Sequence, residues 1–188
     1  SFGTNPDTVV AKALSFIGSL QDQGIVATAK HFPGHGLVKG DTHTRLVYID
    51  GSMGELDVYD PLIDNGVLSI MVGHIAVRNH ATYDTKGLPA TCSRVIVTEL
   101  LREKLGFKGL IVTDAMNMGA LAQIDNAPLK AALAGCDLIL MPPDEAALRQ
   151  DILDAVKMDP NFQKQIESSV KRIIRMKYCL GLLSVHGN

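Results

Sequence analysis

The stretch GFKGLIVTDAMNMG, residues 106–119, decides the fold class of this chain. Its first residue, Gly106, ends a predicted helix that Ser93 caps. The four residues 110–113 then form an apolar run that is too short for a buried helix. Asp114 closes this run, which therefore predicts a buried strand. A helix, a buried strand and a polar residue at the strand's end together indicate one βα repeat of a parallel sheet.

The same alternation of helices and short apolar runs continues in both directions from this stretch. Further strands are predicted at residues 25–29, 67–72 and 138–141. Further helices are predicted at residues 6–20, 55–65 (interrupted by Pro61), 127–134, after 144 and at 162–180, with cap or stop residues at Asn5, Gly135, Asp144 and Gly181. This pattern predicts an α/β fold built on a parallel sheet that is buried on both faces.

Two architectures fit the alternation, a (β/α)8 barrel and an open doubly wound sheet. Lys30 with His31, then His74, then Asp114 lie just past the C-terminal ends of three successive predicted strands. Barrel enzymes gather catalytic groups from several strand ends, whereas an open sheet concentrates ligands at one switch point. We therefore predict a TIM-type (β/α)8 barrel. Only four strands are visible, and 188 residues is fewer than the about 200 of a complete barrel. We expect residues 1–188 to form a partial barrel domain, roughly its C-terminal half.

The composition is that of an ordinary globular protein, with 46% hydrophobic and 20% charged residues. Lys and Arg total 18 and Asp and Glu total 20, which gives a net charge of -2. Because no broad basic surface can form, we expect no nucleic-acid partner. The sequence lacks an apolar run of about 18 residues and a leader pattern, so we expect no membrane span and no secretion signal in this chain.

Two features of the sequence bear on its context. The chain begins at Ser1, directly before a helix-start signal, so we expect that it was cut from a longer protein. Its three cysteines, Cys92, Cys136 and Cys179, are an odd number at wide spacing, which argues against a disulfide framework. We expect them to be small buried hydrophobic residues.

The densest group of chemically reactive residues is KHFPGHG, residues 30–36, followed by Asp41, Thr42 and His43. Three histidines, two lysines and one aspartate within 14 residues are hard to explain by packing, because polar groups beside a buried strand need partners or a function. The glycines allow tight turns and Pro33 stiffens the chain after the strand. We interpret the group as part of a functional site.

A metal centre is one alternative for this group, since His31, His35, Asp41 and His43 are all candidate zinc ligands. The Pro-Gly pair between the first two histidines excludes the regular helix that would align them on one face. We therefore predict no metal and no cofactor.

Asp114 would project from the end of its strand into the mouth of the barrel, held by rigid backbone, and this placement suits a nucleophile. The alternative is that Asp114 caps a following helix, a frequent role of Asp at a βα junction. Asp137 precedes its predicted strand, so we expect it to be structural.

Taken together, KHFPGHG with the nearby DTH, PATCS at residues 89–93, GFKGLIVTDAMNMGA at 106–120 and GCDLILMPPD at 135–144 resemble family 3 glycoside hydrolases, specifically the bacterial β-N-acetylhexosaminidase branch. The resemblance covers nearly the whole chain. It implies a (β/α)8-type barrel and release of terminal β-linked N-acetylglucosamine with retention of configuration, commonly from peptidoglycan fragments. A carbohydrate with terminal N-acetylglucosamine is the implied partner, in the bacterial cytoplasm or periplasm.

The resemblance also implies roles for individual residues. Asp114 would be the nucleophile, His43 the general acid/base and Asp41 its partner, while Lys30 and His31 would bind sugar hydroxyls. The family also uses an Arg immediately before the SFG of residues 1–3 and an acidic residue from an earlier strand, and both lie outside this chain. We therefore expect that this fragment alone is inactive.

The chemistry agrees with these roles, because retaining hydrolysis needs a carboxylate nucleophile and a second group that gives and takes a proton. A histidine with a pKa near 6.5 can do this near neutrality, and a neighbouring carboxylate would fix its tautomer. A neutral acid/base would also tolerate an anionic acceptor, so a phosphorylase stays an alternative. An inactive sugar-binding barrel is another, but it has little reason to keep Asp41, His43 and Asp114 together.

Overall fold

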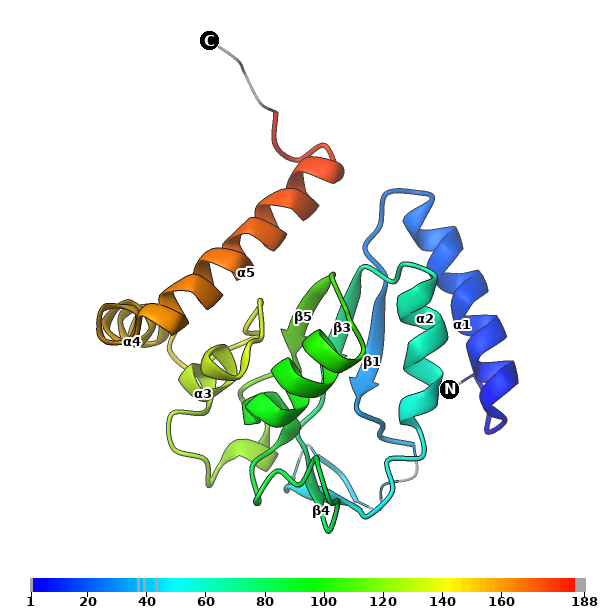
Figure 1. The fold of residues 1–188 in the computed structure, drawn as a ribbon, viewed down its shortest axis with the longest axis horizontal. Helices are drawn as coiled ribbons and strands as arrows, with labels where there is room; N and C mark the ends of the chain where they lie inside the picture. Colours follow the sequence, from blue (N-terminus) through cyan, green and yellow to red (C-terminus); the bar gives the residue numbers. More distant parts are fainter. Residues whose placement is uncertain (1, 37, 39, 43, 185–188) are drawn as a thin grey trace.

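Three parallel strands form the main sheet of the computed structural model, which describes residues 2–36, 38, 40–42 and 44–184. They are β1 (Thr28–Phe32), β3 (Ser69–Val72) and β5 (Leu110–Thr113), in the spatial order β1-β3-β5 (Figure 1). Leu138 continues the order as a parallel bridge to Val112 in β5. Neighbouring strands thus follow the order of the sequence, without the reversal that marks a doubly wound sheet.

The α-helices of the described residues are α1 (Pro6–Gln21), α2 (Tyr59–Asp64), α3 (Ala127–Ala134), α4 (Glu145–Met158) and α5 (Pro160–Cys179). Helix η3 (Val95–Lys104) has the wider hydrogen-bond pattern of a π-helix. Shorter turns of helix are η1 (Leu56–Val58), η2 (Ala90–Cys92) and η4 (Gly119–Leu121). As predicted, the side chain of Asn5 caps α1 and that of Asp144 caps α4.

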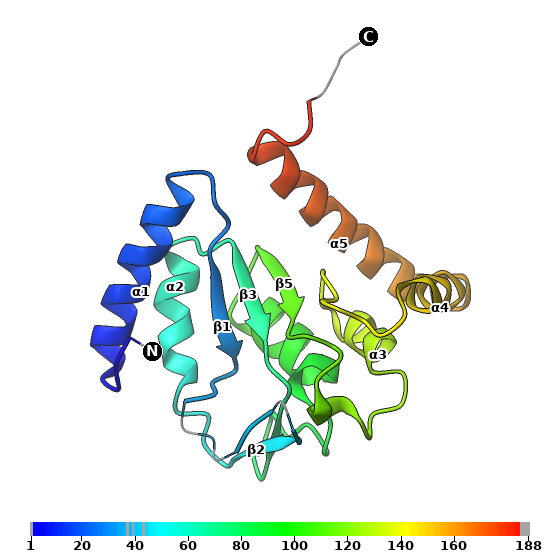
Figure 2. The ribbon, with the colours of Figure 1, turned by 180° about the vertical axis from the view of Figure 1, so that it is seen from behind.

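One face of the main sheet is covered by a helix and the other is not (Figure 1 and Figure 2). In Figure 1, η3, drawn in green, crosses in front of β3 and β5, while Figure 2 shows the strands from behind with no helix of the described residues over them. Burial follows this asymmetry, since Ile70 and Ile111 are fully buried whereas Met71 and Val112 are only half-buried. Because side chains alternate across a strand, Met71 and Val112 line the uncovered face. A barrel has helices outside and side chains inside, so this part of the fold favours the barrel over the two-sided sheet.

A second, two-stranded parallel sheet lies beyond the C-terminal ends of the main strands, at the bottom of Figure 1. It pairs β2 (Val47–Asp50) with β4 (Ile75–Arg78). Neither strand is among those predicted from the sequence, because each lies in a polar, glycine-containing connection. Gly73 and His74 form the short link from β3 to β4.

Two predicted segments differ from the structure at their boundaries. Strand β1 begins three residues later than predicted and extends to Phe32, inside the polar group. The predicted helix at 55–65 is divided into η1 and α2. Pro61 lies in the first turn of α2, where its missing N–H costs no helical hydrogen bond.

The predicted strand at residues 138–141 is wrong beyond its first residue. Leu138 forms only an isolated bridge. Two residues later, the N–H of Leu140 donates to the side-chain Oγ1 of Thr113 (2.9 Å), where a regular ladder would use a backbone carbonyl. Met141 then has a φ of 49°, and a residue in the left-handed region cannot continue an extended ladder.

The hydrophobic core lies between the sheet and its helices, and includes Phe32, Ile70, Val97, Leu101 and Ile111. Cys92 and Cys136 belong to it, and burial raises the pKa of the Cys92 thiol to about 11. Cys179 is exposed on α5, contrary to the expectation that all three cysteines are buried. Among the described residues, no helix has the length and apolarity required to cross a membrane.

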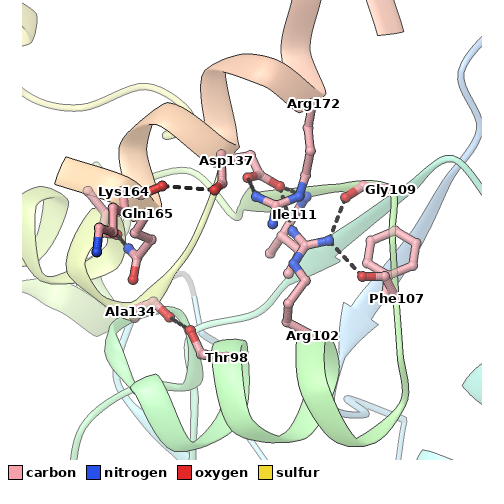
Figure 3. A network of polar contacts seen from close by, with 12 residues as sticks. Thr98, Arg102, Phe107, Gly109, Ile111, Ala134, Asp137, Lys164, Gln165 and Arg172 are labelled. Carbon is pink, nitrogen blue, oxygen red and sulfur yellow. Dashed lines mark hydrogen bonds and ion pairs between the residues drawn. The ribbon is translucent and has the colours of Figure 1, made fainter. Parts of the chain in front are cut away.

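Helix α5 is attached to the sheet through the buried carboxylate of Asp137 (Figure 3). Its oxygens accept hydrogen bonds from Arg102 of η3 (2.7 Å), from Arg172 of α5 (2.9 Å) and from the N–H of Ile111 in β5 (2.9 Å). Arg102 also donates to the carbonyls of Phe107 and Gly109. Asp137 is therefore structural, as its position before the bridge at Leu138 suggested.

Candidate active site

Asp114 lies at the C-terminal end of β5, with its side chain 17% exposed. Its N–H donates to the carbonyl of Val72 in β3 (2.9 Å), and its Oδ1 accepts from the N–H of Ala115 (2.8 Å). The next helical turn, η4, begins only at Gly119, and no side chain caps it. Asp114 therefore does not cap a helix. Its second carboxylate oxygen, Oδ2, faces the side chain of His31 at the C-terminal edge of the sheet.

His31 is brought next to Asp114 by an irregularity in β1. The register between β1 and β3 shifts between Lys30 and Phe32, so His31 is an extra residue in its strand. Such bulges re-aim side chains and are frequent beside active sites. The Nε2 atom of His31 lies 3.6 Å from Oδ2 of Asp114. The structure thus brings together two of the five predicted site residues.

The protonation of His31 is set by its surroundings. Burial lowers its pKa from the ordinary value near 6.5, and the negative charge of Asp114 opposes this shift only in part. The positive charge of Lys30 lowers the pKa of His31 further. His31 is therefore neutral near pH 7, and a separation of 3.6 Å from the carboxylate exceeds a direct hydrogen bond.

Gly73 makes room for His31. A Cβ atom at position 73 would lie 3.1 Å from Cβ of His31 and 3.2 Å from the side chain of Ile75. The N–H of Gly73 also donates to the carbonyl of Phe32 (2.9 Å), which fixes the end of β1 against the end of β3. The sequence alone gives this glycine no role, because only the packing reveals how close it lies to the imidazole.

His74 is fully buried beneath the site, and both ring nitrogens have partners. Its Nδ1 is 2.9 Å from Oγ1 of Thr91, and its Nε2 is 2.9 Å from the carbonyl oxygen of Ala115. Burial lowers the pKa of His74, while the hydrogen bond to Ala115 and the charge of Asp114 oppose the shift. The sequence placed His74 at a strand end but could not show that it contacts the backbone next to Asp114.

The loop after β1 is held at its root by Glu55. Its Oε1 accepts from the N–H of Gly36 (3.1 Å). A Cβ atom at Gly34, where φ is 137°, would lie 2.6 Å from Cβ of Glu55, so this position requires glycine. A Cβ atom at Gly36 would lie 2.4 Å from Oε1 of Glu55 and would displace the carboxylate. The glycines in the KHFPGHG motif thus let the loop lie directly against this carboxylate.

Further along, the same loop contacts the segment that follows β5. Thr42 is buried, and its carbonyl accepts from the N–H of Ala120 (3.3 Å). The hydroxyl of Thr42 is 3.4 Å from Nε2 of His35, whose ring centroid is 5.6 Å from that of His31. The loop around Thr42 is therefore joined to η4, in the segment that follows Asp114 along the chain.

The remaining predicted site residues are Lys30, Asp41 and His43. Lys30 is exposed in β1, next to His31. Asp41 is exposed, and its backbone carbonyl accepts from the N–H groups of Thr44 and Arg45. His43, the predicted acid/base, lies outside the described residues. Leaving that position aside, no group of three or more His, Cys, Asp or Glu side chains in the described part of the chain could hold a metal ion.

Comparisons with known proteins identify the family to which this chain is similar. Residues 1–176 match the model described as the glycosyl hydrolase family 3 N-terminal domain. The chain is 33% identical to a β-N-acetylglucosaminidase/β-glucosidase of Cellulomonas fimi, over 97% of this chain and 35% of that protein. It is also 33% identical to a β-hexosaminidase of Haemophilus influenzae, over 92% of this chain and 52% of that protein.

Among solved structures, the chain is similar to a β-N-acetylhexosaminidase from Beutenbergia cavernae, with a TM-score of 0.85 and 27% identity over 94% of this chain and 54% of that chain. The chain thus spans between about a third and about half of the length of these relatives. With these likenesses, the parallel sheet is identified as part of a (β/α)8 barrel, and the predicted fold class is confirmed.

Proposed function

The chain belongs to glycosyl hydrolase family 3, and on this basis we propose that the protein that contains it is a retaining β-N-acetylhexosaminidase. The proposed reaction releases terminal β-linked N-acetylglucosamine through a covalent intermediate on Asp114. Peptidoglycan fragments are the proposed natural substrates, following the family branch that the sequence resembles.

The observation that carries this proposal is the placement of the Asp114 carboxylate. One oxygen, Oδ1, is bound by the N–H of Ala115, while Oδ2 faces His31 across 3.6 Å. The side chain is held by a strand end and is still partly exposed. A nucleophile needs this combination of a fixed direction and an accessible oxygen.

In the first proposed step, Oδ2 of Asp114 attacks the anomeric carbon while the bond from that carbon to the leaving oxygen breaks. The leaving oxygen takes the proton of His43, whose cation Asp41 stabilises. In the second step, His43 removes a proton from water, and the resulting oxygen nucleophile displaces Asp114 from the anomeric carbon. Two inversions at that carbon give net retention.

Lys30 and His31 are the proposed ligands of the sugar hydroxyls. His31 is neutral near pH 7 for the reason given above, so its ring can donate or accept a hydrogen bond while leaving the carboxylate charge unpaired. Lys30 adds a positive charge and three N–H donors at the neighbouring position. These two side chains would fix the sugar ring above Asp114.

Replacement of the nucleophile tests the proposal in the full-length protein. Asp114→Asn keeps the side-chain volume but removes the attacking oxygen, so kcat on dinitrophenyl β-N-acetylglucosaminide should fall roughly a thousandfold or more. The thermal midpoint should change little. Acid-quenched wild-type enzyme should show a glycosyl adduct, by peptide mass spectrometry, on the peptide that contains Asp114.

Asp154→Asn is the matched control, because Asp154 is exposed on α4 and bonds only within that helix in the contacts described. It should retain wild-type kcat. A loss of less than about tenfold for Asp114→Asn, or a labelled peptide elsewhere in the chain, would mean that another residue is the nucleophile.

A further inference from the structure

We propose that His74, together with Thr91, is a positioning residue for the nucleophile Asp114. This inference rests on the proposed function, because it concerns the same reaction. It gives a role to the PATCS segment at residues 89–93, which supplies Thr91, and to the polar end of β3, which supplies His74. Neither side chain touches the substrate site, since both are fully buried.

The inference starts from a chain of hydrogen bonds that ends on the nucleophile. The imidazole of His74 joins Oγ1 of Thr91 to the carbonyl of Ala115, each at 2.9 Å. The N–H of the same Ala115 donates to Oδ1 of Asp114 at 2.8 Å. The residue whose N–H orients the carboxylate is thus itself held by His74 through its carbonyl.

The peptide that follows Ala115 is fixed from both sides. Its oxygen accepts from His74, and its N–H, on Met116, donates to the carbonyl of Leu140 (2.8 Å). The N–H of Asp114 is bound to Val72. Without the His74 bond, the Ala115 carbonyl would lose its partner in the buried interior, and the peptide could rotate to find another. This peptide is joined through Cα of Ala115 to the preceding peptide, which carries the Ala115 N–H, so its movement would displace that N–H relative to Oδ1 of Asp114.

The direction of each bond follows from donor chemistry. A carbonyl oxygen can only accept, so Nε2 of His74 must carry the hydrogen that faces Ala115. Burial disfavours the imidazolium, which leaves Nδ1 unprotonated and able to accept the hydroxyl proton of Thr91. Thr91 therefore fixes the tautomer of His74 that can hold Ala115. A neutral ring also places no positive charge beneath Asp114.

A set of four variants of the full-length protein tests the inference with dinitrophenyl β-N-acetylglucosaminide. His74→Leu replaces the imidazole with an apolar side chain of similar size that has no donor. Its kcat should fall roughly 10- to 100-fold while KM changes less than threefold, as expected for a displaced nucleophile. His74→Gln retains an N–H donor and should recover most of the lost kcat. Thr91→Val removes only the hydroxyl that fixes the tautomer, so its kcat should lie between these two.

The fourth variant, Thr98→Val, is a matched control. Thr98 lies in η3, and its hydroxyl donates to the carbonyl of Ala134 (2.7 Å), away from Asp114. This variant should lose stability but keep its kcat per folded molecule. Near-ultraviolet circular dichroism measures the folded fraction to which kcat is normalised. If His74→Leu fails to fold, the order wild type, His74→Gln, Thr91→Val still decides the question.

The inference is overturned if folded His74→Leu keeps kcat within threefold of wild type, or if Thr91→Val lowers stability as Thr98→Val does and leaves kcat unchanged. Failure of the proposed function has a different signature, because Asp114→Asn would then remain active. An inactive Asp114→Asn combined with an active His74→Leu would remove the positioning role alone.

Discussion

At the scale of single residues, the site shows how a carboxylate can be oriented without being neutralised. The N–H of Ala115 orients Asp114 from one side, and His31 faces it from the other at 3.6 Å. A charged imidazole at that position would form an ion pair and reduce the electron density available for attack. Because burial lowers the pKa of His31, the ring stays neutral near pH 7.

The acid/base role proposed for His43 gives the sharpest prediction at this scale. An acid is needed in the first step only when the leaving group is basic, whereas a base is needed in the second step for every leaving group. In His43→Ala, a dinitrophenyl glycoside should therefore release a burst of dinitrophenolate and then turn over slowly. Azide should restore the rate, because it attacks the intermediate without base assistance, and the product should be the β-glycosyl azide.

Asp41→Ala should show a weaker form of the same behaviour, since it would impair the imidazole without removing it. Equal losses on good and poor leaving groups in His43→Ala, with neither burst nor azide rescue, would reduce His43 to a binding residue.

At the scale of elements, α5 depends on one buried carboxylate. The side chain of Asp137 is fully buried and is bound by Arg102, which is 14% exposed, and by Arg172, which is 27% exposed. Two guanidinium groups and the start of β5 thus share one anion. Removing one member of such a network leaves uncompensated buried charge, which costs more than the pair itself contributes.

Asp137→Asn should therefore lower the free energy of unfolding by about 3–5 kcal/mol. Urea denaturation of the full-length protein measures the change, with Asp154→Asn expected to stay within about 0.5 kcal/mol of wild type. Hydrogen exchange should accelerate first in α5. A loss below about 1 kcal/mol would mean that α5 is held by packing alone.

The sequence predicted elements best where one local signal was sufficient. The caps at Asn5 and Asp144 and the apolar run of β5 depend on near neighbours, so their patterns are visible in the chain. The predicted strand at 138–141 was wrong because Met141 has a left-handed backbone conformation that ends the pairing. The spacing of apolar residues does not reveal such a conformation. Strands β2 and β4 are stabilised by each other, which single-segment reasoning does not detect.

The site was predictable to a similar degree. The types and strand-end positions of His31 and Asp114 indicated their proximity, because parallel strands end at one edge. The contributions of Gly73, His74 and Thr91 depend on packing between segments far apart in the sequence, so they required the structure. The acid/base pair at Asp41 and His43 stays a prediction.

At the scale of the whole molecule, the main sheet of the described residues is open at two edges. Strand β1 forms one edge, and the segment after Leu138 forms the other, where Leu138 and Leu140 are each 38% exposed. Figure 2 shows the uncovered face between these edges. Unpaired strand edges and exposed apolar side chains favour association with other chains.

A polypeptide of residues 1–188 alone should therefore self-associate and lack a cooperative thermal transition. Size-exclusion chromatography with light scattering should report oligomers or aggregates, whereas the full-length protein should elute as a defined species. A monodisperse monomer with a sharp thermal transition would show that residues 1–188 satisfy their own edges.

The contact between Glu55 and the two glycines of the KHFPGHG motif bears on how this protein can be engineered. Thermostabilisation often begins by replacing loop glycines with alanine, which lowers the entropy of the unfolded chain. At position 34 that route is closed, because φ is 137° and the added methyl group would lie 2.6 Å from Cβ of Glu55. At position 36 the methyl group would displace the Glu55 carboxylate, which accepts from the N–H of Gly36. At Gly54, where a Cβ atom would meet nothing within 4 Å, the route is open, so library design for this loop should keep positions 34 and 36 fixed and vary its surroundings.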